Sequence, residues 1–172
     1  MRVEDLVKAA QKGDDEAFYM LIAENKDKLY SVAYCYLKSH EDVLEAIQEV
    51  TCRAYVKLHK LKEPKYFNTW LIRIAINYCI DEQKRRKKLI FMESDGVVEE
   101  HKNNLNKLIV EEAIEKLSPK CKEVIILKYF QDMTIADISK VVEAPEGTIK
   151  TWLKKGLEEL RDQLNKGGEE GV

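Results

Sequence analysis

The sequence predicts an all-α fold made of two small helical domains joined by a flexible linker. Apolar residues recur at steps of three and four along most of the chain, and no segment shows the alternation typical of a strand. The three prolines, Pro64, Pro119 and Pro145, each fall at an expected helix start, where the missing N–H costs little. Residues 91–107 are acidic and lack regular apolar spacing. The predicted parts are a first domain at 1–90, a linker at 91–107, a second domain at 108–165 and a flexible tail at 166–172.

The composition restricts the possible classes of protein. With 172 residues, 35% of them charged, and a formal net charge of −2, the chain is expected to be folded and soluble, without a strong basic excess. No signal peptide and no apolar run long enough to span a membrane are present, which favours the cytoplasm. No nucleophile–base pair, metal cluster or phosphate-binding loop indicates an enzyme, so no metal, cofactor or small-molecule substrate is expected.

Four cysteines, at positions 35, 52, 79 and 121, are far apart and show no CxxC spacing. Buried free thiols in a reducing compartment are the favoured interpretation. A zinc site formed with His40, His59 or His101 stays an alternative, although no ligand motif supports it.

The stretch 39–61 predicts a helix in the first domain, with Ser39 and Asp42 spaced like a capping box at its start. One side of this helix is apolar, at steps of three and four. The polar side carries Glu41, Glu45, Gln48 and Glu49. Periodicity alone favours a solvated face, whereas a docking surface for a partner protein is the functional alternative.

The next predicted helix, about 66–88, combines an apolar stripe with a polar line. The polar line consists of Arg73, Asn77, Asp81, Lys84 and Lys88. The helix ends in the basic run KRRKK at 84–88, which exceeds what interaction with the helix dipole requires. Together with Tyr66 and Phe67, whose rings can stack on unpaired bases if they are exposed, this run indicates a surface that follows nucleic-acid phosphates. Trp70 is assigned to the core, because aromatic side chains dominate buried area.

Residues 134–164 predict two helices joined by a short turn near Glu143 and Ala144, which is a helix-turn-helix. Thr134 and Asp137 again have the spacing of a capping box. The expected buried face of the last helix consists of Ile149, Leu153, Leu157, Leu160 and Leu164. The opposite face consists of Gly147, Thr151, Lys154, Lys155 and Glu158, flanked by Thr148 and Lys150. Small residues followed by lysines suit entry into the major groove, but an amphipathic hairpin of a helical bundle fits the pattern about equally well.

These motifs carry a family resemblance. The region-four domain of bacterial extracytoplasmic-function (ECF) sigma factors resembles the segment AIEKLSPKCKEVIILKYFQDMTIADISKVVEAPEGTIKTWLKKGLEEL. The PEGT-aliphatic-K string within it is a specific mark of that domain. Region 2.2 of the same family is similar to EDVLEAIQEVTCRAYVKL, and regions 2.3 and 2.4 are similar to FNTWLIRIAINYCIDEQKRR. The resemblance covers nearly the whole chain, with the segments in the family's order.

The resemblance implies a promoter-specificity subunit of RNA polymerase rather than an enzyme. The first domain, sigma region 2, would dock on the β′ clamp helices and would read and help to melt the −10 element. The second domain, sigma region 4, would bind the β flap and read the −35 element with its helix-turn-helix, while the acidic linker threads toward the RNA exit path. The implied partners are core RNA polymerase, promoter DNA and an anti-sigma factor, which in this family is often membrane-bound.

Matched by position, the resemblance also implies roles for individual residues. The implied contacts with core polymerase are Glu45, Gln48, Glu49 and Arg53. A flipped non-template base would be captured by the loop 60–66 with Phe67 and Asn68. The −10 element would further meet Arg73, Asn77, Asp81, Lys84 and Arg85. The −35 element would meet Thr148, Lys150, Thr151, Trp152, Lys154 and Lys155.

The chain departs from the family's pattern at three places. Trp152 stands where an arginine is common, and Gly156 stands near a position that is often basic. Val142-Glu143 replaces the usual Leu-Gly before the turn. The −35 preference and the geometry of the turn therefore stay open. Two other classes also stay open: a stand-alone helix-turn-helix regulator would not need the first domain, and a helical adaptor that binds only protein would keep its activity if KRRKK were neutralised.

Overall fold

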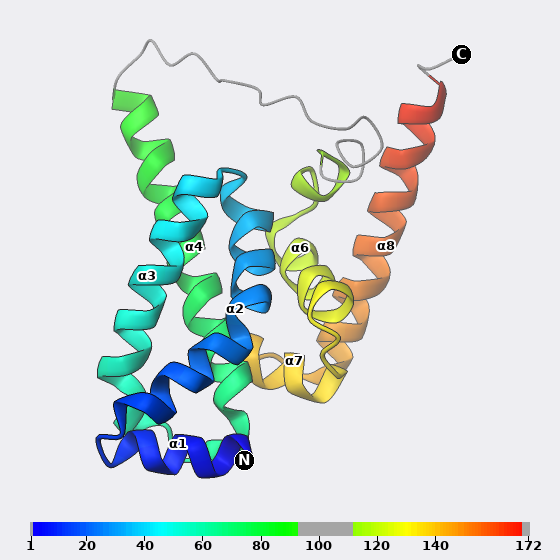
Figure 1. Cartoon of the computed structure of the whole chain (residues 1–172). Coiled ribbons are helices and arrows are strands. Elements are labelled where there is room, and N and C mark those ends of the chain that lie inside the picture. Colours follow the sequence, from blue (N-terminus) through cyan, green and yellow to red (C-terminus); the bar gives the residue numbers. More distant parts are fainter. Residues whose placement is uncertain (1, 93–111, 170–172) are drawn as a thin grey trace. The chain divides into compact units, whose positions relative to one another are not determined.

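The computed structural model describes residues 2–92 and 112–169, and every regular element in these two ranges is helical (Figure 1). The chain divides into two compact units, Met1–Ser94 and Asp95–Val172. The predicted all-α fold with two helical domains is therefore confirmed for this part of the chain. The predicted linker lies outside the described residues from position 93 onward, whereas Phe91 and Met92 still belong to a helix.

Unit 1 is built around a long central helix, α2, which packs against the other three helices. Its elements are α1 (Val3–Gln11), α2 (Asp15–Leu37), α3 (His40–Lys57), the 3₁₀ turns η1 (Leu58–Lys60) and η2 (Pro64–Tyr66), and α4 (Phe67–Met92). The core includes Leu6, Leu21, Leu29, Val32, Val43, Val50, Leu71 and Ile76. Gln11 holds the connection between α3 and α4, because its Nε2 donates to the carbonyl oxygens of Leu58 (2.9 Å) and Leu61 (2.8 Å).

Two helix starts have the predicted caps. Ser39 Oγ accepts a hydrogen bond from the amide of Asp42 at 3.4 Å, and Thr134 Oγ1 accepts one from the amide of Asp137 at 3.1 Å. Each cap satisfies an amide that the first turn of a helix would otherwise leave unpaired.

The prediction of buried thiols is confirmed for two of the four cysteines. Cys79 and Cys121 are buried, and burial raises the pKa of the Cys79 thiol to about 12. Cys35 is half-buried. Cys52 is exposed, so the prediction is wrong for it. It lies two residues from the buried Val50, and a step of two turns a helical side chain to the opposite side.

The described part of the chain offers neither a membrane span nor a metal site. No helix in it combines the length and the apolar character that crossing a membrane requires. No group of His, Cys, Asp and Glu side chains in it is arranged to hold a metal ion, and His101 lies outside it.

In unit 2, α6 and α7 lie against the long last helix, α8. The elements are a helical turn at 112–115, α6 (Pro119–Ile125), the π-helical turn η3 (Ile126–Phe130), α7 (Ile135–Val142) and α8 (Glu146–Glu169), which continues beyond the predicted domain end at 165. Gly156 lies in the contact of α8 with α6. A Cβ at this position would lie 3.0 Å from Ile125 Cγ1 and 3.3 Å from Cys121 Cβ. The missing side chain therefore allows the two helices to approach closely.

The buried face of α8 differs from the predicted one in the second half of the helix. Leu157 and Leu164, predicted to be buried, are 42% and 40% exposed, and Leu160 is half-buried. After the buried Leu153, the contact line steps by three residues to Gly156 rather than by four to Leu157. The last turns of α8 also extend beyond α6 and α7 (Figure 1), so they have less of the unit to pack against.

Candidate nucleic-acid and polymerase interfaces

The turn of the helix-turn-helix closes without a glycine. Glu143 follows α7 with φ 56° and ψ 46°, the left-handed conformation that glycine adopts most easily, and its amide donates to Ser139 O. Ser139 Oγ donates to the carbonyl oxygen of Ala144 at 2.6 Å. These contacts fix the direction in which α8 leaves the turn, which the sequence Val142-Glu143 had left open.

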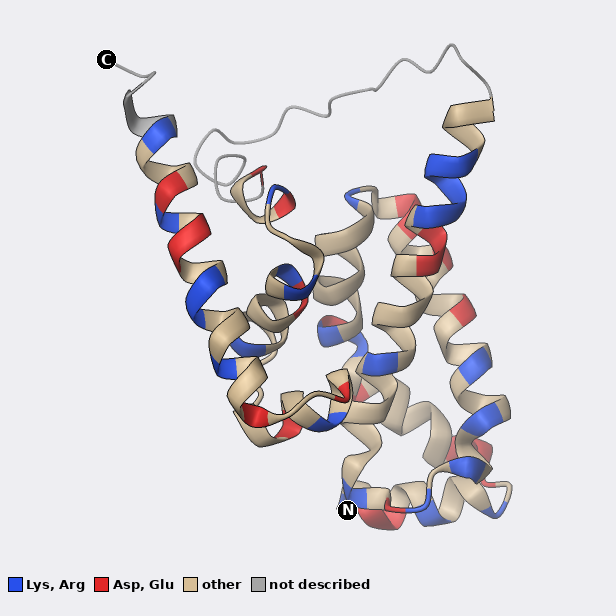
Figure 2. Ribbon diagram, turned by 180° about the vertical axis from the view of Figure 1, so that it is seen from behind, with Lys and Arg blue, Asp and Glu red and all other residues tan. Residues whose placement is uncertain are grey.

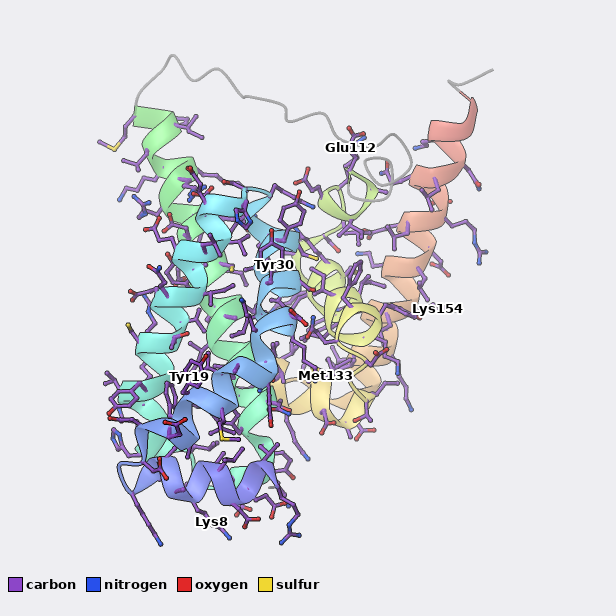
Figure 3. All side chains as sticks on the ribbon, viewed as in Figure 1. Lys8, Tyr19, Tyr30, Glu112, Met133 and Lys154 are labelled. Atoms are coloured by element: carbon purple, nitrogen blue, oxygen red, sulfur yellow. The ribbon has the colours of Figure 1, made fainter. Side chains whose placement is uncertain are left out.

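The exposed face of α8 carries small and basic residues at the predicted positions, and Thr151 and Lys154 among them are predicted to meet the −35 element. Gly147, Thr151 and Lys154 follow one another at steps of four and three, and all three are exposed. Figure 3 shows Lys154 on the outer side of α8. Thr151 Oγ1 donates to the carbonyl oxygen of Gly147 at 3.0 Å, which leaves the lone pairs of the hydroxyl oxygen as acceptors for a ligand.

The other predicted −35 residues differ in exposure and in partners. Lys150 and Lys155 are exposed on the flanks of this face, and Thr148 is half-buried. Lys155 Nζ lies 3.9 Å from Glu159 Oε1. Lys150 forms no ion pair within the described residues, so its charge is available to a partner.

Gly147 is required neither by the packing nor by the backbone of unit 2. A Cβ at this position would have no neighbour within 4 Å, and its φ lies outside the left-handed region. Glycine lowers the stability of a helix, so its presence has a cost and no intramolecular gain. The remaining physical advantage is room for another molecule to approach the backbone at the start of α8.

Trp152 lies toward α6 rather than on the exposed line of α8. Its ring is half-buried, and Lys120 Nζ lies 5.8 Å from the ring centroid, within the range of a cation–π interaction. Lys120 Nζ also lies 3.5 Å from Glu123 Oε2. The tryptophan therefore joins α8 to the start of α6 and brings a lysine to the edge of the exposed face.

The polar line of α4 lies on one face of the helix, as predicted. Its members are the half-buried Arg73 and the exposed Asn77, Asp81, Lys84 and Lys88. Trp70, assigned to the core from the sequence, is only half-buried and lies seven residues before Asn77, hence on the same face. Figure 2 shows that Lys and Arg gather near the C-terminal end of α4.

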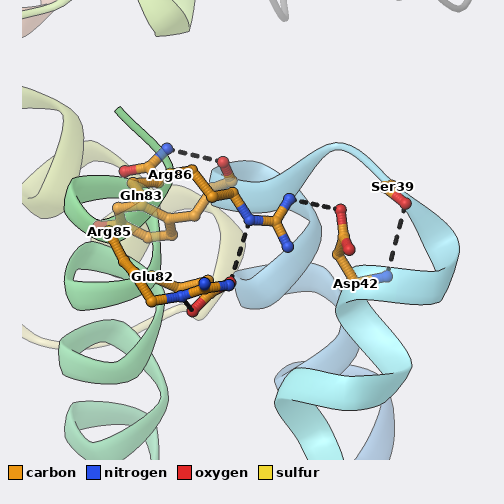
Figure 4. Close-up of polar contacts among 7 residues, drawn as sticks. Ser39, Asp42, Glu82, Gln83, Arg85 and Arg86 are labelled. Carbon is orange, nitrogen blue, oxygen red and sulfur yellow. Dashed lines mark hydrogen bonds and ion pairs between the residues drawn. The ribbon is translucent and has the colours of Figure 1, made fainter. Parts of the chain in front are cut away.

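Two arginines of the basic run turn toward carboxylates instead (Figure 4). Arg85 binds Glu82 through Nη2–Oε1 (2.6 Å) and Nε–Oε2 (3.0 Å). Arg86 donates from Nε to Glu82 Oε1 (3.1 Å) and from Nη1 to Asp42 Oδ2 (2.6 Å). Hydrogen bonds from Arg85 and Arg86 lower the pKa of Glu82 to about 2, and the hydrogen bond from Arg86 holds the pKa of Asp42 below its usual range.

These pairs change the interpretation of the run KRRKK. Arg85, predicted to meet the −10 element, already has a bidentate partner in the free chain. Lys84 forms no ion pair in the described part of the chain and keeps its charge for a ligand. The sequence signal that was missed is Glu82, which stands three residues before Arg85 and four before Arg86, the spacings at which helical side chains meet.

At the start of α4 the structure corrects the role of Phe67. The ring is completely buried, with its centroid 5.8 Å from that of Trp70, so it offers no surface for stacking on a base. Asn68 is half-buried, and its Oδ1 accepts a hydrogen bond from Nδ2 of Asn25 at 3.1 Å. Asn25, only 2% exposed, was not singled out from the sequence, although an amide four residues after Leu21 interrupts an apolar stripe.

The residues predicted to meet core polymerase lie on α3, and three of them gather beside a tyrosine of α4. Arg53 Nε lies 2.8 Å from Glu49 Oε1, and its guanidinium carbon lies 5.0 Å from the centroid of the Tyr78 ring. Burial, with the negative charges of Glu82, Glu45 and Glu49 nearby, raises the pKa of Tyr78. Gln48 is exposed on the same helix. Tyr78 was missed because it follows Leu71 and Ile74 at steps of three and four, and this apolar spacing suggested a buried position.

The sequence matches two family models. The model described as Sigma-70 region 2 matches residues 21–89, and the one described as Sigma-70, region 4 matches residues 107–160. The ECF RNA polymerase sigma factor SigW of Bacillus subtilis (strain 168) is 31% identical over 182 residues, which cover 95% of this chain and 97% of SigW. The ECF RNA polymerase sigma-E factor of Escherichia coli (strain K12) is 27% identical over 177 residues, with 92% of each chain covered.

Solved structures share the fold. CnrH, solved in complex with the cytosolic domain of CnrY, matches with a TM-score of 0.77 at 21% identity, covering 95% of this chain and 97% of CnrH. The sigma factor RpoE of Bartonella quintana, solved with the anti-sigma factor NepR, matches with a TM-score of 0.75 at 18% identity, covering 86% of this chain and 96% of RpoE. The similarity to SigW, which extends over nearly the full length of both proteins, identifies more than a fold. The chain belongs to the ECF family of RNA polymerase sigma factors.

Proposed function

We propose that this sigma factor binds core RNA polymerase in the cytoplasm and selects promoters by reading a −35 element with α8 and a −10 element with α4 and the loop before it. The observation that carries the proposal is the exposed start of α8, where Gly147, Thr151 and Lys154 follow a turn of fixed geometry. A recognition helix enters the major groove with its first residues toward the base edges. The protein acts through binding, and no reaction is assigned to it.

At the −35 element, the peptide backbone at the start of α8 comes close to the DNA. Gly147 leaves room for the approach, and the amides of the first turn can bind a phosphate. Lys150, Lys154 and Lys155 neutralise phosphates beside the groove. Thr151 presents an acceptor to a base edge. Trp152 does not supply the bidentate contact to guanine that an arginine makes, so we expect a −35 preference different from that of relatives with arginine there.

At the −10 element, the exposed line of α4 supplies an amide from Asn77 and a cation from Lys84. The half-exposed ring of Trp70, rather than the buried Phe67, is an aromatic surface next to the loop 60–66, and the half-buried Tyr66 ends that loop. Asn25 holds the Asn68 amide in one orientation. This pre-organisation reduces the entropy lost when a base that has left the stack is bound.

The α3 surface of Glu45, Gln48, Glu49 and Arg53 is the proposed contact with the β′ clamp helices, and Tyr78 belongs to the same surface. Arg53 is oriented by Glu49 and by the ring of Tyr78 and therefore presents a fixed guanidinium edge. RpoE was solved with an anti-sigma factor, and we extend this partner class to the present chain. An anti-sigma factor that covers α3 would block polymerase binding.

The test combines the chain with core polymerase that lacks sigma factor and with a promoter library, followed by mapping of transcript starts. We expect a stable complex and start sites that share one −35 and one −10 sequence. A complex that does not form, or starts without sequence preference, would overturn the proposal. A helical adaptor or a stand-alone regulator would give neither result.

A matched pair of variants tests the role of α8. Lys150→Ala with Lys155→Ala removes two cations from the exposed face near its start, and Arg161→Ala with Lys166→Ala removes two exposed cations from the second half of the same helix. We expect the first pair to lower initiation at −35-dependent promoters and to flatten its salt dependence, with core binding unchanged. The second pair is the control. Loss of core binding in the first pair would show that this face is misassigned.

A further inference from the structure

The exposed line of α4 continues beyond its predicted −10 residues and becomes apolar at its end. Asn77, Lys84 and Phe91 are each seven residues apart, nearly two full turns, so all three lie on one face. Phe91 is 90% exposed, more than any other large apolar side chain in the described ranges. The last turn of α4 projects beyond the ends of α2 and α3 (Figure 1). All four residues of 89–92 are apolar and exposed, and such a cluster of apolar side chains at the end of a polar face indicates an interaction site.

The charges beside Phe91 select its partner. Lys84, Lys87 and Lys88 are exposed around the same end of α4, and no acidic residue occurs from 84 to 92. Arg85 and Arg86 do not compete with these lysines, because they are held by Glu82 and Asp42. A partner that fits this end carries negative charge on its surface and apolar groups between the charges. Double-stranded DNA has this chemistry, with phosphates along the groove and thymine methyl groups on its floor.

The geometry points to Phe91 as a contact with the duplex immediately upstream of the −10 element, with its ring against a thymine methyl group and with Lys84 and Lys88 on flanking phosphates. Fourteen residues separate Asn77 from Phe91, which corresponds to about 21 Å of helix, or roughly six base pairs of duplex. The inference rests on the proposed −10 role of α4. It adds a base preference at a position that the −10 residues do not reach.

The chemistry of the contact gives a direct test. Holoenzyme is assembled from the full chain and core polymerase, and the base pairs upstream of the −10 element are randomised. We expect a thymine preference roughly six base pairs from the base that Asn77 meets. Phe91→Ser should abolish this preference and leave the −35 and −10 preferences and core binding unchanged. The control is Ile90→Ser, which removes a 58% exposed apolar side chain about 100° around the helix and should keep the preference.

Deoxyuridine isolates the methyl group, because it differs from thymidine only there. At the preferred position, deoxyuridine should reduce open-complex formation by the parent chain several-fold and leave Phe91→Ser unaffected. An equal preference in the parent and in Phe91→Ser, or indifference of the parent to deoxyuridine, would overturn the inference. Loss of all start-site selection would instead count against the proposed function itself. Binding of the free parent chain to anionic vesicles, lost in Phe91→Ser while the base preferences stay, would assign this end of α4 to a lipid surface and also overturn the inference.

Discussion

Arg86 near the end of α4 and Asp42 in the first turn of α3 form an ion pair of 2.6 Å across 44 residues of sequence. The same guanidinium donates to Glu82, and the neighbouring Gln83 donates from Nε2 to the carbonyl oxygen of Tyr36 at 2.7 Å (Figure 4). These contacts tie the end of α4 to α2 and α3. The side chain of Arg86 therefore joins the helix proposed to follow DNA to the helix proposed to meet polymerase.

Arg86 is predicted to contribute to stability rather than to DNA binding. Arg86→Met leaves the carboxylates of Asp42 and Glu82 without their shared cation, so we expect a loss of about 1–2 kcal/mol, between the values for exposed and for buried ion pairs. Urea unfolding of unit 1 followed by circular dichroism measures the loss. Lys87→Met is the control, because it removes the same charge from an exposed position. Equal stability of the two variants would contradict the role assigned to Arg86.

The lowered pKa of Glu82 predicts that unit 1 loses stability in acid. Its pKa is about 2 in the folded chain against an ordinary value of 4.5, because Arg85 and Arg86 donate to it. A carboxylate whose pKa is lower in the folded than in the unfolded chain contributes its full stability above the unfolded-state pKa. This contribution is lost as the pH falls through the folded-state pKa. The midpoint temperature of thermal unfolding should therefore decrease as the pH is lowered from about 4.5 to 2. Glu82→Gln should melt lower near neutral pH and depend less on pH in that window, whereas parallel curves would exclude Glu82 as the cause.

The elements that the sequence predicts well are those set by local periodicity and capping. The helix around Val43 and Val50 and the capped start of α7 at Thr134 depend on neighbours within a few residues, and both were found as predicted. The exposed positions of Lys150 and Lys154 follow from the same periodicity. Local spacing is therefore sufficient to place the candidate −35 surface on its helix.

The differences arise where a partner is distant in sequence. Leu157 was predicted to be buried, but Gly156 is the residue that meets α6, and only the close approach of Ile125 and Cys121 shows this. The orientation of Arg86 depends on Asp42, 44 residues away, and that of Asn68 depends on Asn25, 43 residues away. Tertiary packing decides these features, and the periodicity of one helix does not contain that information.

The left-handed conformation of Glu143 predicts that glycine is more stable than alanine at this position. A residue with a Cβ pays roughly 1 kcal/mol to hold the left-handed conformation that Glu143 adopts, and glycine does not. Glu143→Gly should therefore be more stable than Glu143→Ala by about 1 kcal/mol, because both lack the glutamate side chain and differ only in the Cβ. Chemical unfolding of unit 2 within the full chain measures the difference. A variant with glycine no more stable than the alanine variant would show that the turn relaxes at no cost.

Two glycines of α8 should respond to alanine in opposite ways. At Gly156, a methyl group would lie 3.0 Å from Ile125 Cγ1, so Gly156→Ala should destabilise unit 2 by about 1–3 kcal/mol through overpacking. At Gly147, a methyl group would meet nothing within 4 Å, so Gly147→Ala should leave the fold intact and stabilise the helix by up to about 1 kcal/mol. Stability alone therefore separates a glycine needed for packing from one that is not.

Promoter binding gives the second half of this test. If DNA approaches the backbone at the start of α8, the methyl group of Gly147→Ala occupies that space, and initiation at −35-dependent promoters should fall although the chain is more stable and binds core polymerase normally. Thr151→Ser is a useful control, because it retains the hydroxyl group on the same face and removes only a methyl group. A Gly147→Ala variant that is both more stable and fully active would show that the DNA does not come close to the backbone at this position, and the glycine would then have no role in recognition.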